Sequence, residues 1–246
     1  MTQLHPIGDR IWMADGPIVD FYSFPYPTRM VIARLEGDAL WVWSPIALSD
    51  ELRAEVESLG HVAHLVSPNK IHHLFLSEWK DAFPRALLWG PASTIAKRTD
   101  LAFQPALEDT PPPEWGPDID QAWFRGSFMM DEVVFFHRPS RTAIFADLIE
   151  AFSEDFLQKH WSWWQRPLAH IDGVTAKSPH APGEWRLSFT DRTPTRAARD
   201  KVLGWKPEQA TLAHGEWCKT DGLAFVERAL EWIGKSPEEP QDDATA

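Results

Sequence analysis

Three short polar segments of the sequence carry residue types that bind divalent metal ions, and each follows an apolar stretch. They are residues 68–73 (Pro-Asn-Lys-Ile-His-His), Asp147 and His214. Polar residues at the ends of buried strands are where layered α/β proteins place their chemistry. Imidazole and carboxylate groups suit zinc and similar ions, because loops from separate strand ends can converge on one point. The pattern predicts a metal site or a polar pocket built from these segments.

Each of these signals has a structural alternative. An Asp at a strand end is often a turn or helix-capping residue, and a lone His before Gly, as in His214, is often structural or solvated. His72 and His73 are adjacent, and neighbouring residues of a helix point about 100° apart, so usually only one of them faces a given site. The residue types alone leave open whether the three segments meet.

The composition excludes several classes of protein. The chain has 246 residues and one cysteine, Cys218, so neither a disulfide framework nor a cysteine-based zinc cluster is available. Lysine and arginine number 24 against 36 acids, a net charge of −12, and no basic cluster offsets the repulsion from nucleic acid. No apolar run approaches the roughly 18 residues of a membrane span, and no secretory signal precedes the first strand. We expect a cytoplasmic protein that binds neither nucleic acid nor membrane.

Predicted strands and helices alternate around the polar segments. Short β-branched or aromatic stretches predict strands, and residues 36–38 (Glu-Gly-Asp) are a hairpin turn signal. Ser49, followed by two acids, begins a helix that Gly60 ends. The predicted strands are residues 10–13, 30–35, 39–43, 62–67, 86–89, 132–137, 142–147 and 210–214, and the predicted helices are residues 49–59, 72–83, 152–164, 194–203 and 223–233. This alternation predicts an α/β fold with crossover helices.

Two stretches interrupt the alternation. Five prolines between residues 103 and 117 exclude regular structure, and we interpret this stretch as an exposed connection within one domain. Residues 237–246 hold four acids and no base, which is typical of a disordered, solubilising tail. We therefore predict a single domain over residues 1–236 and a disordered acidic tail over residues 237–246.

The order of elements, together with two motifs, resembles the metallo-β-lactamase fold over residues 5–233. Residues 39–45 (Ala-Leu-Trp-Val-Trp-Ser-Pro) match the strand that ends in Asp-Thr-Gly in active members, with Ser44 and Pro45 in place of the acid and its neighbour. Residues 65–73 fall where the family has His-x-His-x-Asp-His. The resemblance implies an αββα sandwich, two facing sheets with outer helices, and a subgroup with a degenerate metal motif.

The resemblance also implies which metal position survives. Aligning His73 with the last histidine of the motif places Pro68 and Lys70 on its first two histidines, and the third-motif histidine has no counterpart, so one metal position is lost. The ligands of the other position correspond to four residues of this chain, His72, His73, Asp147 and His214. Lys70 and Asn69 are then candidates for stabilising an oxyanion, and Lys70 for replacing the lost cation with its ammonium.

Two functions are compatible with this pattern. In the first, one divalent ion, preferably zinc, lowers the pKa of bound water from 15.7 to about 7, and hydroxide attacks a small ester, lactone, thioester or amide. In the second, the protein is catalytically inactive, binds no metal, and uses the same cleft to bind a small molecule or a partner. The nearby Trp161, Trp163 and Trp164 are interpreted as helix packing, a lid or the surface of a homodimer.

Overall fold

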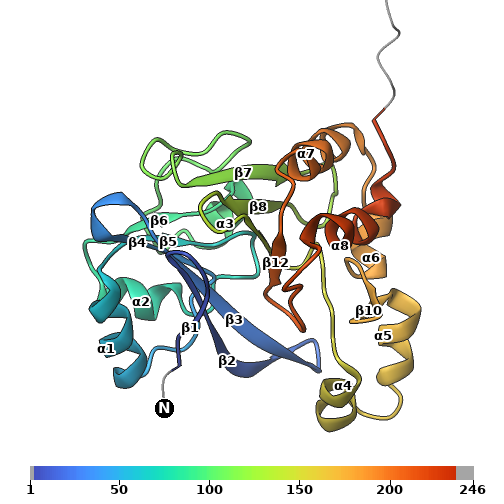
Figure 1. The fold of residues 1–246 in the computed structure, drawn as a ribbon. Coiled ribbons are helices and arrows are strands. Elements are labelled where there is room, and N and C mark those ends of the chain that lie inside the picture. The colour runs from blue at the N-terminus through green and yellow to red at the C-terminus, as the bar shows by residue number, and fades with distance from the viewer. Residues whose placement is uncertain (1–2, 237–246) are drawn as a thin grey trace, which may run out of the picture.

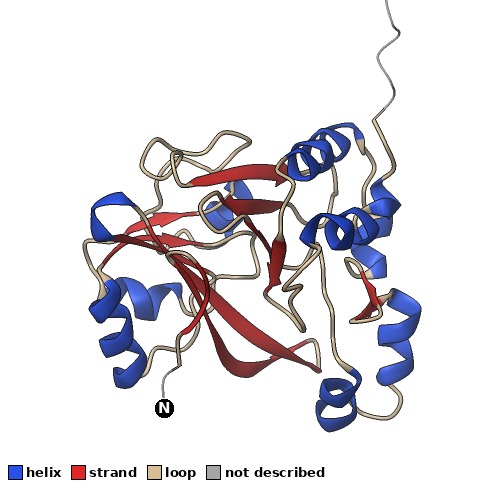
Figure 2. Ribbon diagram, viewed as in Figure 1, coloured by secondary structure: helices blue, strands red, loops and turns tan. Residues whose placement is uncertain are grey.

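The structure is a computed structural model that describes residues 3–236, and it is built on two β-sheets that lie face to face (Figures 1 and 2). The first sheet has six strands in sequential order. Its first four strands are antiparallel, and the last two run parallel to their neighbours. The strands are β1 (His5–Gly8), β2 (Ile11–Phe21), β3 (Phe24–Arg34), β4 (Ala39–Trp43), β5 (His61–Val66) and β6 (Leu87–Trp89).

The second sheet has four strands in the order β12-β9-β8-β7. Strands β7, β8 and β9 are antiparallel, whereas β12 runs parallel to β9. Parallel strands end at the same edge of a sheet, so the segments that follow β9 and β12 emerge side by side. The strands are β7 (Ile119–Phe124), β8 (Glu132–His137), β9 (Thr142–Phe145) and β12 (Gln209–Leu212), and a separate short pair is β10 (Val174–Thr175) with β11 (Ser178–Pro179).

Helices cover the outer face of each sheet (Figure 1). Helices α1 and α2 pack on the first sheet, and α6, α7 and α8 pack on the second. The α-helices are α1 (Asp50–Leu59), α2 (Leu76–Ala82), α3 (Ala92–Lys97), α4 (Glu154–His160), α5 (Arg166–Asp172), α6 (Gly183–Leu187), α7 (Thr193–Gly204) and α8 (Gly222–Ala229), and the 3-10 helices are η1 (Glu36–Asp38) and η2 (Glu231–Ile233). Among residues 3–236 no helix has both the length and the apolarity needed to cross a membrane.

Alternation along the strands produces three layers of apolar core. In β4, Trp41 and Trp43 point between the two sheets, whereas Leu40 and Val42 point towards α1 and α2. This is the period of two expected for a strand that is buried on both faces. The architecture is therefore an αββα sandwich, as predicted from the resemblance.

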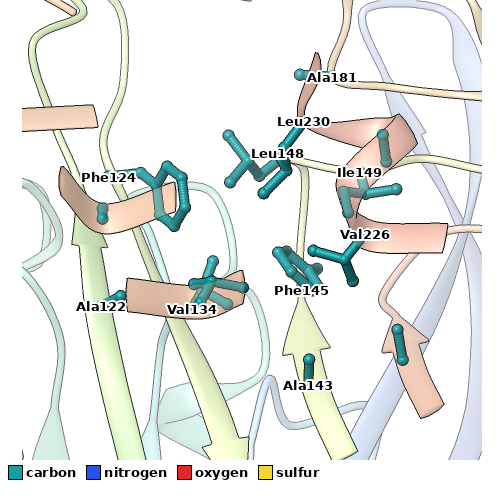
Figure 3. Close-up of a cluster of buried hydrophobic side chains, with 14 of the residues drawn as sticks. Ala122, Phe124, Val134, Ala143, Phe145, Leu148, Ile149, Ala181, Val226 and Leu230 are labelled. Atoms are coloured by element: carbon teal, nitrogen blue, oxygen red, sulfur yellow. The ribbon is translucent and has the colours of Figure 1, made fainter. Parts of the chain in front are cut away.

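The outer core of the second sheet is formed in the same way. Figure 3 shows Phe145 of β9 between Val134 of β8 and Val226 of α8, and Leu230 belongs to the same cluster. All four side chains are fully buried. Because the faces of β8 and β9 are both apolar, the two strands are held rigidly between layers, and the segment that follows β9 starts from a fixed point.

Most predicted strands and helices are present, with three differences. The helix predicted from residue 72 begins only at Leu76, since residues 70–75 form turns. Helix α4 ends at His160, so the tryptophans that follow it are not helical. Strands β1, β7, β10 and β11 and helices α3, α5 and α6 were not predicted. The proline-rich stretch contains neither a helix nor a strand, as expected. The predicted acidic tail lies outside the described residues.

Candidate metal centre

Three of the predicted ligands lie together at the edge where the two sheets meet. Nε2 of His72 lies 3.1 Å from Oδ2 of Asp147, and Nε2 of His214 lies 3.2 Å from Oδ1 of the same carboxylate. One ligand atom from each residue falls within 4.8 Å of the other two. Asp147 follows β9 and His214 follows β12, so the parallel pairing of these strands brings the two side chains together.

Both histidines are oriented by a second hydrogen bond. Nδ1 of His214 lies 2.7 Å from the carbonyl oxygen of Pro27, which can only accept, so Nδ1 carries the proton. In a neutral ring Nε2 then has a lone pair directed at the Asp147 carboxylate. Two acceptors 3.2 Å apart repel each other, so this contact requires a second proton on the ring or a cation shared with Asp147. Such a pairing of a backbone carbonyl with Nδ1 is typical of metal-bound histidine.

Ser44 orients His72 in the same way. Its hydroxyl lies 2.7 Å from Nδ1 of His72. Ser44 is the first residue after β4, it is buried, and its φ of 48° lies in the left-handed region that non-glycine residues rarely adopt. A strained residue in contact with a candidate ligand indicates that the orientation of His72 is held at some cost in stability.

Asp147 is held by a buried polar network. Nδ2 of Asn69 donates to Oδ2 of Asp147 at 2.6 Å and to Glu132 at 3.3 Å. The carboxylate of Glu132 also accepts from the backbone N–H groups of Ala146, Asp147 and Leu148, at 2.8 to 3.1 Å. Glu132 therefore fixes the turn that presents Asp147. Asn69 was predicted as an oxyanion donor, but in this structure its amide is engaged with the two carboxylates.

The network sets the ionisation of both acids. Burial raises the pKa of Asp147, but the charges and hydrogen bonds of His72 and His214 outweigh it and hold the pKa well below its usual range. Burial, and then the charge of Asp147, raises the pKa of Glu132, against the opposing effect of backbone N–H donors. Asp147 is thus the anionic ligand of the group.

Two predicted site residues lie outside the group of three. His73 faces Arg98, whose guanidinium lies 3.4 Å from its Nδ1, so its imidazole does not join Asp147. His73 points away from Asp147 because it is adjacent to His72, and the side chains of consecutive residues in a turn point in different directions. The ammonium of Lys70 donates to the backbone carbonyl of Met129, and its place at the lost metal position stays a prediction.

The group lines a cavity of about 760 Å³. Tyr26 and Glu150 line the same cavity; the ring of Tyr26 meets that of His214 edge-on at 5.1 Å, and its hydroxyl lies 3.4 Å from Oε2 of Glu150. Burial, and then the Glu150 charge, raises the pKa of Tyr26, and burial followed by the Asp147 charge raises that of Glu150. Both shifts favour protonated side chains that donate hydrogen bonds.

A family model with the description "Domain of unknown function (DUF4336)" matches residues 8–160, more than half of the chain. The chain belongs to the DUF4336 family. A search of curated proteins found no sequence match.

Solved structures place this DUF4336 protein in the metallo-β-lactamase fold. DIM-1 metallo-β-lactamase exposed to ceftazidime has a TM-score of 0.59 and 11% identity, over 94% of this chain and 95% of that one. A metallo-β-lactamase from Hirschia baltica has the same TM-score and identity, over 94% and 96%. The Flv1 flavodiiron core from Synechocystis sp. PCC6803 has a TM-score of 0.60 and 12% identity, over 94% of this chain but 60% of that one. At these identities the likeness establishes the fold.

The residues that support the group of three are only partly visible in the sequence. Glu132 is an acid at the start of a predicted strand, and the structure shows it fully buried. Ser44 was noticed only as a replacement for a family acid. Trp161 packs in a small core and donates to the carbonyl of Pro25, whereas Trp163 and Trp164 are exposed.

Proposed function

We propose that this DUF4336 protein is a mononuclear metal-dependent hydrolase of a small ester, lactone, thioester or amide. The observation that supports it most is the contact between His214 and Asp147. With Nδ1 of His214 committed to a carbonyl, its Nε2 faces a carboxylate across 3.2 Å, and a shared divalent cation satisfies both groups.

The donor set fits a zinc ion. Ligands about 2.0–2.1 Å from a tetrahedral ion lie about 3.4 Å apart. The two histidines lie 3.1 Å and 3.2 Å from different oxygens of Asp147, and one ligand atom from each residue lies within 4.8 Å of the other two, so small side-chain rotations bring three ligand atoms around one ion. Two imidazoles and one carboxylate are a ligand set of catalytic zinc sites, which keep one position open for water or substrate. Because His73 lies outside the group, three protein ligands remain, as such a site requires.

The residues of the chain have distinct roles in this proposal. A bound divalent ion supplies Lewis acidity and a more acidic water. Asn69 and Glu132 hold Asp147 in place, and Ser44 and the carbonyl of Pro27 fix the two imidazoles. Hydrolysis joins the oxygen of water to the carbonyl carbon and releases an alcohol, thiol or amine that gains a proton. Tyr26 lines the cavity beside His214, and its hydroxyl donates to Glu150.

A second candidate is a non-catalytic pocket for a small molecule. It is favoured by the fact that both oxygens of Asp147 already have protein partners, Asn69 and His72 on one and His214 on the other. In that case Nε2 of each histidine donates a hydrogen bond to Asp147, with Nδ1 of His72 accepting from the hydroxyl of Ser44, and the network is complete without an ion. The two candidates differ in whether the protein takes up metal.

The test is a zinc titration of the metal-free protein, followed by hydrolysis assays on ester, lactone, thioester and amide substrates. We expect one zinc per chain for the wild type, loss of uptake in Asp147→Asn and His214→Ala, and unchanged uptake in His73→Ala, the matched histidine outside the group. Hydrolysis is expected only in the zinc-loaded protein. A wild type that binds no more zinc than Asp147→Asn contradicts the proposal, and a zinc-loaded protein inactive on every substrate class favours the non-catalytic pocket.

A further inference from the structure

The mouth of the cavity is unusually apolar for a solvent-exposed surface. Four large apolar side chains line the cavity and are nevertheless exposed, with Tyr22 84%, Leu74 57%, Met129 39% and Phe21 38% accessible. They come from three separate segments: the β2–β3 hairpin, the turns before α2 and the loop before β8. Exposed apolar groups from separate segments that converge on one cavity mark a binding surface more than a folding requirement.

Apolar side chains also continue from the mouth into the cavity. Ile71, Phe75 and Met130 line it and are half-buried, and Trp185 lines it while buried. The indole N–H of Trp185 is satisfied by the carbonyl of Met130, so the indole needs no polar partner from a ligand. Methionines add adaptable contacts, because their side chains are flexible and polarisable. The cavity thus offers an apolar path from its mouth towards the His72–Asp147–His214 group.

The charges on the cavity wall favour an uncharged occupant. Lys70 and Lys97 line the cavity, but the ammonium of Lys70 is engaged with a backbone carbonyl. Asp20 and Glu184 also line it, in addition to Asp147 of the group itself, whereas the raised pKa of Glu150, caused by burial and then by the Asp147 charge, favours its uncharged form. Acids outnumber lysines among these residues, so a free carboxylate on the occupant gains little electrostatic attraction from the cavity wall.

We propose that the cavity binds the apolar acyl chain of an uncharged ester or thioester, with the carbonyl at the His72–Asp147–His214 group and the chain running out between Tyr22 and Met129. The identification of the occupant as a substrate rests on the proposed function, whereas its binding does not. Each methylene of a saturated chain that leaves water contributes about 0.8 kcal/mol, which corresponds to up to about fourfold in affinity.

The test measures binding of 2-alkanones to the metal-free protein by calorimetry. These ketones carry an uncharged carbonyl and cannot be hydrolysed, so their binding is independent of metal and of activity. From 2-pentanone to 2-nonanone we expect affinity to rise two- to fourfold per methylene, and nonanoate to bind more weakly than 2-nonanone. An affinity that does not change with chain length, or tighter binding of nonanoate, overturns the proposal.

Variants of residues at the cavity mouth test where the alkyl chain of the ligand lies. Leu74→Ser combined with Met129→Ser is expected to weaken 2-nonanone binding at least tenfold and 2-pentanone binding less than threefold. The matched control is Ile171→Ser on α5, which removes an apolar side chain that is 78% exposed and does not line the cavity; its affinities should equal those of the wild type. Equal weakening of 2-nonanone binding by the control and by the double variant contradicts the proposed position of the alkyl chain.

Zinc uptake without ketone binding rejects this inference alone, and ketone binding without zinc uptake rejects the proposed function alone.

Discussion

Ser44 connects backbone strain with the orientation of a candidate ligand. Its φ of 48° is costly for a residue with a Cβ, and its hydroxyl is the partner of Nδ1 of His72. Second partners of this kind fix the ring and raise the basicity of the other nitrogen. The hydroxyl is therefore expected to matter for metal binding, and the backbone conformation for stability.

We predict that Ser44→Ala and Ser44→Gly both weaken zinc binding about 10- to 100-fold, because both remove the hydroxyl. The two variants should differ in stability, since glycine relieves a left-handed strain of about 1 kcal/mol that alanine keeps. Zinc titration and chemical denaturation measure the two effects. Equal zinc affinity in wild type and Ser44→Gly would show that the hydrogen bond does not support the site.

A buried histidine away from the site makes stability depend on pH. His64 in β5 accepts a hydrogen bond from the indole of Trp89 at 3.1 Å, and burial lowers its pKa to about 4. The unfolded chain, with a pKa near 6.5, takes up a proton before the folded protein does. Stability is thus greatest above pH 6.5 and falls as the pH decreases towards 4, by up to about 3 kcal/mol for this residue.

His64→Asn isolates this contribution. The asparagine oxygen can accept from Trp89 and does not titrate, so we expect the variant to lose less stability than the wild type between pH 6.5 and 4. Urea denaturation at a series of pH values provides the measurement. A wild type and a variant with the same loss over that range would show that His64 protonates equally in the folded and unfolded states.

At the residue scale, the candidate ligands were easier to predict than the residues that support them. His72, Asp147 and His214 lie together in the structure, as the polar segments after the predicted strands indicate, and their binding of a metal stays a prediction. Asn69 and Lys70 were predicted near the site, but the partners of Asn69 are on and after strands of the second sheet and the partner of Lys70 is in the loop before β8, and no local pattern encodes these contacts.

At the scale of elements, Glu132 at the start of β8 fastens the turn that follows β9. Three consecutive backbone N–H groups and the Asn69 amide donate to its carboxylate, which is fully buried. We predict that Glu132→Ala lowers the free energy of unfolding by about 3–5 kcal/mol, because these buried donors lose their acceptor. Glu132→Gln keeps one acceptor oxygen and should lose less. Chemical denaturation of both variants tests this, and a loss below 1 kcal/mol in Glu132→Ala would contradict the role.

Helices and strands with a strong apolar periodicity in the sequence were predicted, and those with a weak periodicity were missed. Strand β4 alternates large apolar side chains that fill two core layers, so its pattern is unambiguous. Helix α2 begins at Leu76 and not near His72, because the backbone of Asn69 and His72 is held in turns by the hydroxyl of Ser67. Such a local contact between a side chain and the backbone leaves no periodic pattern in the sequence.

At the scale of the whole molecule, the candidate centre joins the two sheets. His72 follows the strands of the first sheet, whereas Asp147 and His214 follow strands of the second. An ion at the group therefore crosslinks the two halves of the sandwich. Zinc at 100 times its Kd should stabilise the folded chain by about 2.7 kcal/mol and raise Tm by roughly 5–10 °C in one cooperative transition. Scanning calorimetry that shows two transitions, with only one shifted by zinc, would contradict this coupling.

The fold as a whole was predictable because order and spacing of elements limit how two sheets can pack. The resemblance to the metallo-β-lactamase fold rested on that order, and the structural likeness at 11% identity shows that the fold is retained with little of the sequence. The ligand set was harder to predict, since four residues matched a motif and geometry selects three.

The most direct measurement of the central claim is anomalous scattering at the zinc edge from crystals grown with zinc. We predict one peak per chain, about 2.0–2.2 Å from Nε2 of His72, Nε2 of His214 and the carboxylate of Asp147. No peak at this group, or a peak held by His73 in place of His72, would contradict the account.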